Sequence, residues 1–252
     1  VWQLGPYKLG MLGAPTTYLL YGAIGVMAAV QFLRIWQING HVFQRPVPAF
    51  DRYPFKQVAL LNLVYMASFG SELAVVSMLP LYFLDTFDIS PMLAGMLGGS
   101  FALMNLFGRP GGGYLADRYG RKLITILMLA GIAVGYFFMA RIDSSWPLPL
   151  AVTLVVLCSI FVQGGCGAVY ASVPLVKRRL TGQVAGMAGA YGNVGGVVFL
   201  VVLALVPSDQ FFLVLGAIAL AIMSLVMIFM DEPDPQTSEV MPDGSVRMID
   251  VT

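Results

Sequence analysis

Two ionisable residues lie inside long apolar segments, where a charge is rare. Arg109 follows the apolar run "GSFALMNLFG", and Glu72 lies within "LNLVYMASFGSELAVV". A charge at the depth of a bilayer is costly and normally faces a cavity or a partner. The guanidinium of Arg109 is planar, always charged and rich in donors, so it suits a flat oxyanion, and the Asn105 amide lies one helical turn away. The alternative is that Arg109 reaches the lipid headgroups or pairs with Glu72.

The segment that contains Glu72 also carries a polar and aromatic stripe. Asn62, Tyr65, Phe69 and Glu72 are spaced by three, four and three residues, so a helix would place them on one face. A packing face would be mostly aliphatic, whereas this one offers an amide, a phenol, an aromatic ring and a carboxyl group. We interpret the stripe as the lining of a pathway, although aromatic stripes also serve as core.

A third polar position lies in the glycine-rich stretch "GQVAGMAGAYGNVGGVVF". Glycines repeated every three or four residues allow two helices to pack closely. Asn193 in the middle of this bare surface is harder to explain by packing. The glycines would also let a small ligand approach the backbone and the Asn193 amide.

The composition indicates what must position these residues. The chain has 252 residues, of which 58% are hydrophobic and 11% charged, against roughly 25% charged in soluble domains. It therefore lacks the polar residues to coat a water-facing surface and is predicted to be an integral membrane protein. The net charge of +1 does not indicate nucleic acid, and a single histidine, His41, predicts neither a metal nor a cofactor. Cys158 and Cys166 would lie about 12 Å apart on a helix, too far for a disulfide.

Seven stretches are long enough to span a bilayer as helices, which takes about 20 residues each. They are Ala14–Trp36, Phe55–Leu84, Pro91–Ala116, Leu123–Ala140, Leu148–Val173, Gly182–Val206 and Phe211–Met230. Basic loops alternate with acidic or neutral ones, which predicts an N-terminus outside and a cytoplasmic C-terminus. The chain begins with valine and has no recognisable signal peptide, so we expect it to be a fragment of a longer protein.

Seven spans and the tripeptide "DRY" at residues 117–119 would also fit a seven-helix receptor. The last span lacks the Asn-Pro-x-x-Tyr sequence of that class, however, and "DRY" recurs at residues 51–53. A longer match covers residues 113–122, "GYLADRYGRK", which resembles the G-x-L-A-D-R-x-G-R-K signature of the major facilitator superfamily. The residues that we assign to this conformational motif are Gly113, Asp117, Arg118, Gly120, Arg121 and Lys122. Gly113 would admit a neighbouring helix, and Asp117 would pair with a basic residue or cap a helix.

The resemblance implies the major facilitator fold, an all-α membrane bundle of twelve helices with both ends inside. An outside start and seven spans then correspond to helices 6–12, with the motif between helices 8 and 9. We accordingly expect helix 6 and the cytoplasmic inter-half loop in residues 1–56, and the C-terminal six-helix half in residues 57–230. Residues 231–252 are polar and proline-rich, and we expect a disordered cytoplasmic tail.

Within that superfamily, "AGAYGNVGG" resembles the glycine-rich signature of the nitrate/nitrite porter family, and the similarity extends from about Tyr53 to Val206. The resemblance implies that Arg109 grips nitrate, that Tyr65 packs against the anion and that the Gly192–Gly196 region lines the route. The substrate-binding residues that we expect are Arg109, Tyr65, Asn105, Asn193, Gly192, Gly195 and Gly196. The partner arginine and the first copy of the signature, which the family carries on helices 2 and 5, are absent from this chain and would belong to a missing N-terminal half.

We therefore expect a secondary active transporter that moves nitrate or nitrite by alternating access in the plasma (inner) membrane. Glu72 is the candidate for proton coupling, since inward movement of an anion must be driven. A facilitator for a sugar or drug and a membrane anion sensor or receptor are the alternatives. The sequence contains neither a phosphate-binding loop nor a nucleophile–histidine pair, the motifs that would indicate an enzyme. The sequence does not separate nitrate from nitrite as the substrate, or proton symport from anion exchange as the mode of transport.

Overall fold

The computed structural model describes residues 13–40, 52–232, 236–240 and 244–250. The chain divides into two compact units, Val1–Arg52 and Tyr53–Thr252, whereas the sequence placed the boundary after residue 56. The described part of the first unit is a single helix, α1 (Ala14–Asn39). His41 lies outside the described residues.

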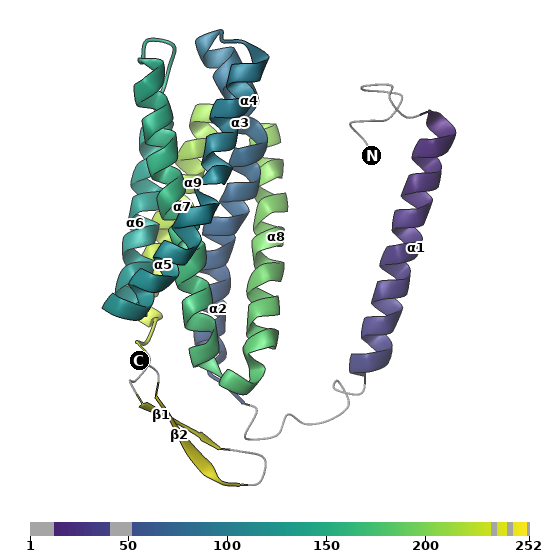
Figure 1. Cartoon of the computed structure of the whole chain (residues 1–252), viewed down its shortest axis with the longest axis vertical. Helices are drawn as coiled ribbons and strands as arrows, with labels where there is room; N and C mark the ends of the chain where they lie inside the picture. The colour runs from purple at the N-terminus through teal and green to yellow at the C-terminus, as the bar shows by residue number, and fades with distance from the viewer. Residues whose placement is uncertain (1–12, 41–51, 233–235, 241–243, 251–252) are drawn as a thin grey trace. The chain divides into compact units, whose positions relative to one another are not determined.

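The second unit is a bundle of long helices (Figure 1). Its elements are α2 (Phe55–Tyr65), the π-helix η3 (Met66–Gly70), α3 (Ser71–Phe87), α4 (Pro91–Leu103), α5 (Asn105–Tyr119), α6 (Arg121–Met139), α7 (Leu148–Val176), the 3₁₀ turn η4 (Arg178–Leu180), α8 (Thr181–Leu205) and α9 (Ser208–Phe229). When elements that follow without a break are joined, the described chain has seven helices long and apolar enough to cross a membrane. This confirms the predicted polytopic helical bundle.

Close backbone contact joins α5 to α7, and it fixes the surroundings of Arg109. A Cβ added to Gly112 would overlap the backbone of Gly164, and one added to Gly167 would overlap the Arg109 carbonyl. The two helices therefore meet without intervening side chains, which only glycine permits. Because α7 also packs against α2, α6 and α8, this contact anchors Arg109 to the centre of the unit.

The helix expected over residues 55–84 is interrupted by η3, between the two ends of the polar stripe. The Ser68 hydroxyl donates to the Val64 carbonyl at 2.8 Å, within this irregular turn. A Cβ on Gly70 would lie 2.9 Å from the backbone of Gly195, so η3 and α8 approach closely. Single-turn π-helices occur often at functional sites because they redirect side chains.

The tail differs from the expected disorder. Strands β1 (Gln236–Val240) and β2 (Val246–Asp250) pair antiparallel, with Gln236 opposite Asp250. Gly244 has a φ of 82°, a backbone conformation that glycine adopts without penalty and that suits a turn. Polar composition predicted disorder because it offers little to bury, whereas the structure joins these two segments through the backbone hydrogen bonds of an antiparallel ladder.

Candidate functional site

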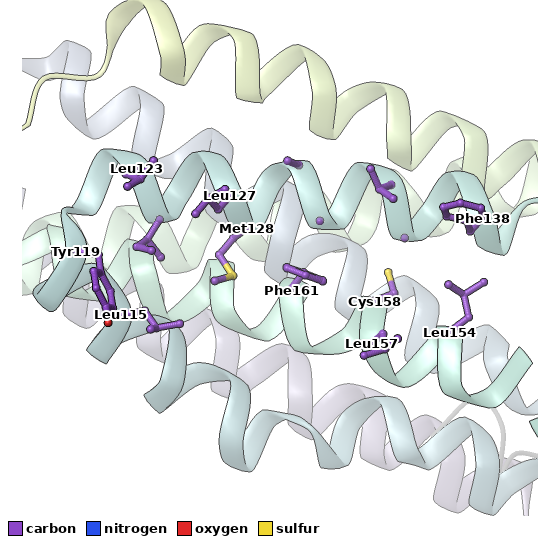
Figure 2. A pocket seen from close by; sticks show the side chains of 15 residues that line it. Leu115, Tyr119, Leu123, Leu127, Met128, Phe138, Leu154, Leu157, Cys158 and Phe161 are labelled. Carbon is purple, nitrogen blue, oxygen red and sulfur yellow. The ribbon is translucent and has the colours of Figure 1, made fainter. Parts of the chain in front are cut away.

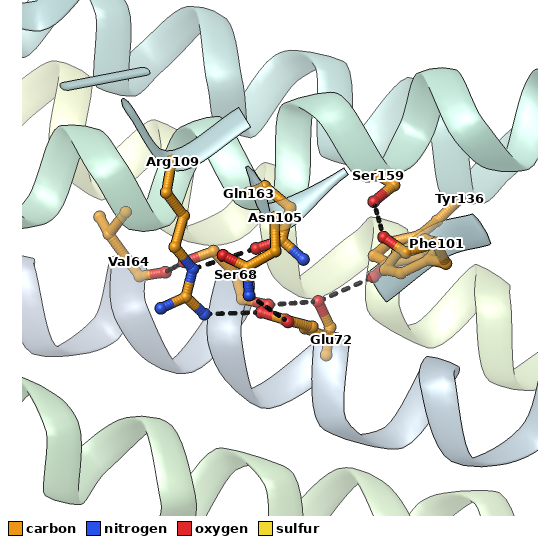
Figure 3. A network of polar contacts seen from close by, with 10 residues as sticks. Val64, Ser68, Glu72, Phe101, Asn105, Arg109, Tyr136, Ser159 and Gln163 are labelled. Atoms are coloured by element: carbon orange, nitrogen blue, oxygen red, sulfur yellow. Dashed lines mark hydrogen bonds and ion pairs between the residues drawn. The ribbon is translucent and has the colours of Figure 1, made fainter. Parts of the chain in front are cut away.

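The buried charges form one polar cluster between α3, α5 and α7 (Figure 3). Arg109 Nη2 lies 3.0 Å from Glu72 Oε2, in an ion pair that is also a hydrogen bond. Asn105 Nδ2 donates to the other carboxylate oxygen, Oε1, at 3.5 Å. Arg109 Nε donates to Gln163 Oε1 at 3.2 Å. One arginine thus joins three helices through polar contacts.

An aromatic surface supports the guanidinium. Arg109 Cζ lies 5.3 Å from the centroid of the Phe69 ring, at the distance of a cation–π interaction. Phe69 stacks on Tyr65, with ring centroids 5.1 Å apart and planes inclined by 16°. Tyr170 meets Tyr65 edge-on at 5.2 Å. The predicted stripe therefore does converge on Arg109, through Phe69 and Glu72.

Pairing of Arg109 with Glu72 was one form of the alternative interpretation of the sequence, and the structure places the two residues in that pair. The Arg109 side chain nevertheless keeps 29% of its surface exposed, against 9% for Glu72. Only its Nε and Nη2 atoms make hydrogen bonds to described residues. The guanidinium therefore retains accessible donors, and an arriving anion would either share it with Glu72 or displace the carboxylate.

Three glycines of α8 pack closely against neighbouring elements: Gly192 against Tyr65 and Phe69, Gly195 against Met66, and Gly196 against Leu73. Gly192, Gly195 and Gly196 are buried, and a Cβ on Gly192 would lie 2.6 Å from Tyr65 and 2.7 Å from Phe69. The close-packing interpretation therefore accounts for these three glycines. Gly192 acts on the cluster indirectly, by letting α8 pack against the aromatic support of Arg109.

Asn193 lies apart from the polar cluster. Its side chain is exposed and donates to the Gly189 carbonyl of its own helix at 2.9 Å. The structure thus brings Arg109, Asn105, Tyr65 and Glu72 together and does not add Asn193 to them.

The conformational motif forms the turn between α5 and α6. Gly120 has a φ of 102°, which side-chain-bearing residues rarely adopt. Asp117 accepts from Arg121 at 2.9 Å, so it pairs with a basic residue of its own motif. Arg118 donates to the Tyr114 hydroxyl at 2.8 Å. Gly113 faces the Gly167 carbonyl, where an added Cβ would make an ordinary contact at 3.6 Å.

Residues just after the last helix hold this turn. Glu232 accepts from the backbone N–H groups of Arg121 and Lys122, at 2.6 and 2.8 Å, and so caps the N-terminus of α6. The neighbouring Asp231 forms an ion pair with Lys56 at 2.9 Å. The hydrogen bond from Lys56 lowers the pKa of Asp231 below its usual value. The end of α9 is thereby tied to the beginnings of α2 and α6.

A large cavity lies elsewhere in the unit and does not suit an anion. It has a volume of about 810 Å³ and is bordered by α5, α6 and α7. Figure 2 shows its lining of apolar side chains such as Leu127, Phe138 and Phe161. An anion there would lose its hydration without gaining donors, so the Arg109 cluster remains the candidate site.

Two residues of these networks, Gln163 and Glu232, were not identified as candidates from the sequence. Gln163 is an amide within a long apolar helix, and intramembrane polar residues are a recognised signal for function. Glu232 lies in a polar segment, where an acidic residue is unremarkable. Its role depends on a contact with Arg121, which is distant in sequence.

Together, these features define a polytopic helical membrane protein with a partly buried arginine at the meeting point of three of its helices. The profile of the Major Facilitator Superfamily matches residues 4–200. The chain therefore belongs to the major facilitator superfamily.

The chain is similar to named transporters of this superfamily. It is 38% identical over 235 residues to the nitrate/nitrite transporter NrtP of Nostoc punctiforme, covering 92% of this chain and 47% of that protein. It is 42% identical over 242 residues to NrtP of a Picosynechococcus species, covering 86% and 45%. It is 39% identical over 147 residues to the high-affinity nitrate transporter 2.3 of rice (Oryza sativa subsp. japonica), covering 55% and 28%. The chain thus spans about half the length of the first two relatives.

Proposed function

We propose that this chain is the C-terminal part of a transporter that carries nitrate or nitrite across the plasma (inner) membrane, with its own C-terminus in the cytoplasm. The observation that carries the proposal is the partly exposed Arg109 guanidinium, which contacts Glu72, Gln163 and the Phe69 ring. A planar cation with free donors is suited to a planar oxyanion. The names of the similar proteins supply the substrate.

In this proposal, the anion binds between two halves that rock about a site near the bilayer midplane. Arg109 supplies one positive charge, and the N-terminal half supplies the second arginine. Asn105 adds a donor and Tyr65 an aromatic contact, while Gly192 of α8 packs against the aromatic pair. Asn193 would join only if α8 turned relative to its position here, because its amide bonds to Gly189.

The motif turn is proposed to stabilise one orientation of the two halves. Its contacts include the Asp117–Arg121 pair, in which the Asp117 side chain is largely exposed and that of Arg121 is not, and the cap by the exposed Glu232. Such contacts can form in one state and break in another.

Glu72 is proposed to couple a proton to the anion by competition for Arg109. Its carboxylate is planar and already accepts from the two donors assigned to the anion, Arg109 and Asn105. Protonation of Glu72 would free Arg109, and anion binding would favour that protonation. The neighbouring titratable groups on the other packed helices are Tyr136 of α6 and Cys166 of α7. A proton that accompanies the anion offsets the opposing membrane potential, about 2.3 kcal/mol per charge per 100 mV.

The test is uptake of labelled nitrate and nitrite by cells that lack their own transporters. The chain is expressed alone and together with the N-terminal half of a similar nitrate/nitrite transporter, a combination that we call the two-part transporter. We expect uptake only from the two-part transporter, and its loss in R109K, because a lysine ammonium cannot reproduce the forked donors. The matched control is R141K, at an exposed loop position.

Uptake of a sugar or a drug in place of nitrate would overturn the substrate assignment. Nitrate binding without uptake would instead indicate a sensor or receptor. Nitrate uptake that survives R109K at the control level would remove Arg109 from the site.

A further inference from the structure

Gln163 enters the cluster from α7, directly against α5. Its side chain is completely buried. A Cβ added to Gly108 would lie 2.5 Å from the Gln163 Cβ, so glycine at position 108 makes room for this side chain beside Arg109. The close helix contact therefore places one particular amide next to the guanidinium.

The orientation of that amide follows from its partner. Gln163 Oε1 accepts from Arg109 Nε at 3.2 Å. Because a guanidinium has donors only, the carboxamide must turn its oxygen toward it. The amide nitrogen, Nε2, is then directed away from Nε, and it is buried without a hydrogen bond to any described residue.

Other buried polar side chains of the same helix are satisfied. Ser159 donates to the Phe101 carbonyl at 2.5 Å, and Ser172 donates to the Ala168 carbonyl at 2.9 Å. Buried donors without acceptors are rare in folded proteins because each loses its hydration without replacement. If Gln163 served only to accept a hydrogen bond from Arg109, its buried NH₂ group would have no use. The unpaired Nε2 therefore points to a ligand that accepts a hydrogen bond from it.

We propose that Gln163 is a further donor of the oxyanion site, and the inference rests on the proposed nitrate function. When the anion replaces the Glu72 carboxylate at Arg109, Gln163 Nε2 donates to one of its oxygens. Nitrate and nitrite oxygens only accept hydrogen bonds, so they match this donor. Gln163 and Glu72 both contact Arg109, and the Asn105 carboxamide contacts the carboxylate that the anion would replace (Figure 3).

The first measurement is nitrate binding to the purified two-part transporter by titration calorimetry. Q163M keeps the side-chain length and apolar bulk but removes both hydrogen-bonding groups. We expect binding about tenfold weaker or more, the effect of losing a hydrogen bond to a charged group. Q210M, at an exposed position beyond the bundle core, is the matched control and should bind normally.

The second measurement separates donation to the anion from support of Arg109. The transporter is labelled with ¹⁵N-glutamine, and the Gln163 side-chain signal is identified by its absence from Q163M. Saturating nitrate, but not chloride, should move the Gln163 NH₂ proton signal downfield. Nitrate binding with an unmoved signal, or normal binding by Q163M, overturns this assignment alone. Absence of nitrate binding by the unaltered transporter overturns the proposed function and this assignment with it.

Discussion

The competition between Glu72 and the anion gives a prediction whose magnitude can be worked from the Arg109 contacts. E72Q removes the negative charge but keeps the side-chain length and one oxygen that Arg109 can reach. Arg109 stays charged in E72Q, so its hydrogen bond to the glutamine oxygen remains charge-assisted and only the attraction between the two opposite charges is lost. For a pair that is neither fully exposed nor fully buried, that attraction is on the order of 1–1.5 kcal/mol, or roughly five- to tenfold in affinity. We therefore expect E72Q to bind nitrate five- to tenfold more tightly at neutral pH.

The same competition sets the pH dependence. Proton coupling through Glu72 predicts that nitrate binding by the unaltered transporter depends on pH. In E72Q this dependence should disappear, and nitrate accumulation driven by a proton gradient should be lost while nitrate exchange continues. Binding titrations and initial uptake rates between about pH 5.5 and 8 measure both effects.

D85N is the matched control, because Asp85 lies at the exposed end of the same helix and its loss changes the net charge equally. It should leave nitrate affinity and its pH dependence unchanged. An E72Q transporter with the pH dependence of the unaltered protein would refute the coupling role of Glu72. Weaker nitrate binding in E72Q would refute the competition itself.

Two further predictions concern packing and the cytoplasmic contacts. G192A should lower the thermal unfolding midpoint of the two-part transporter and reduce uptake, because the new methyl group overlaps Tyr65 at a cost of about 1–3 kcal/mol. The control G186A, with open space at its Cβ, should have the stability and uptake of the unaltered protein. Equal stability of the two variants would contradict the close packing at Gly192. The lowered pKa of Asp231 means that its pair with Lys56 contributes at neutral pH and is lost as the pH falls through the lowered value. Amide hydrogen exchange at the start of α2, compared at a common intrinsic rate, should therefore accelerate below about pH 4 in the unaltered protein and be fast at every pH in D231N; identical profiles would contradict the pairing.

The membrane spans could be predicted from the sequence because hydropathy sums local contributions. The alternative pairing of Arg109 with Glu72 could also be foreseen, since few other charges lie at bilayer depth. The π-helix η3 could not be predicted from the sequence, because it depends on packing against α8 as well as on its own residues. Gly70 and Gly195 meet there across a wide separation in sequence.

The remaining differences have the same physical origin. Asn193 looked functional because it stands among glycines, yet its amide is satisfied by the Gly189 carbonyl one turn away. The pairing of Gln163 with Arg109 joins residues 54 positions apart, and that of Glu232 with Arg121 joins residues 111 apart. Residue spacing along a helix predicts which residues share a face, but it does not predict which other helix that face packs against.

The glycine contact between α5 and α7 has a consequence for any alternating mechanism. Backbones that touch at Gly112 and Gly164 have no side chains that could rearrange, so the two helices should travel as one solid block. Arg109 and Gln163 would then keep the same separation whether the route opened to the outside or to the cytoplasm. Any difference in grip between loading and unloading would have to originate in the other elements around the site, α2, η3, α3 and α8, or in the opposite half.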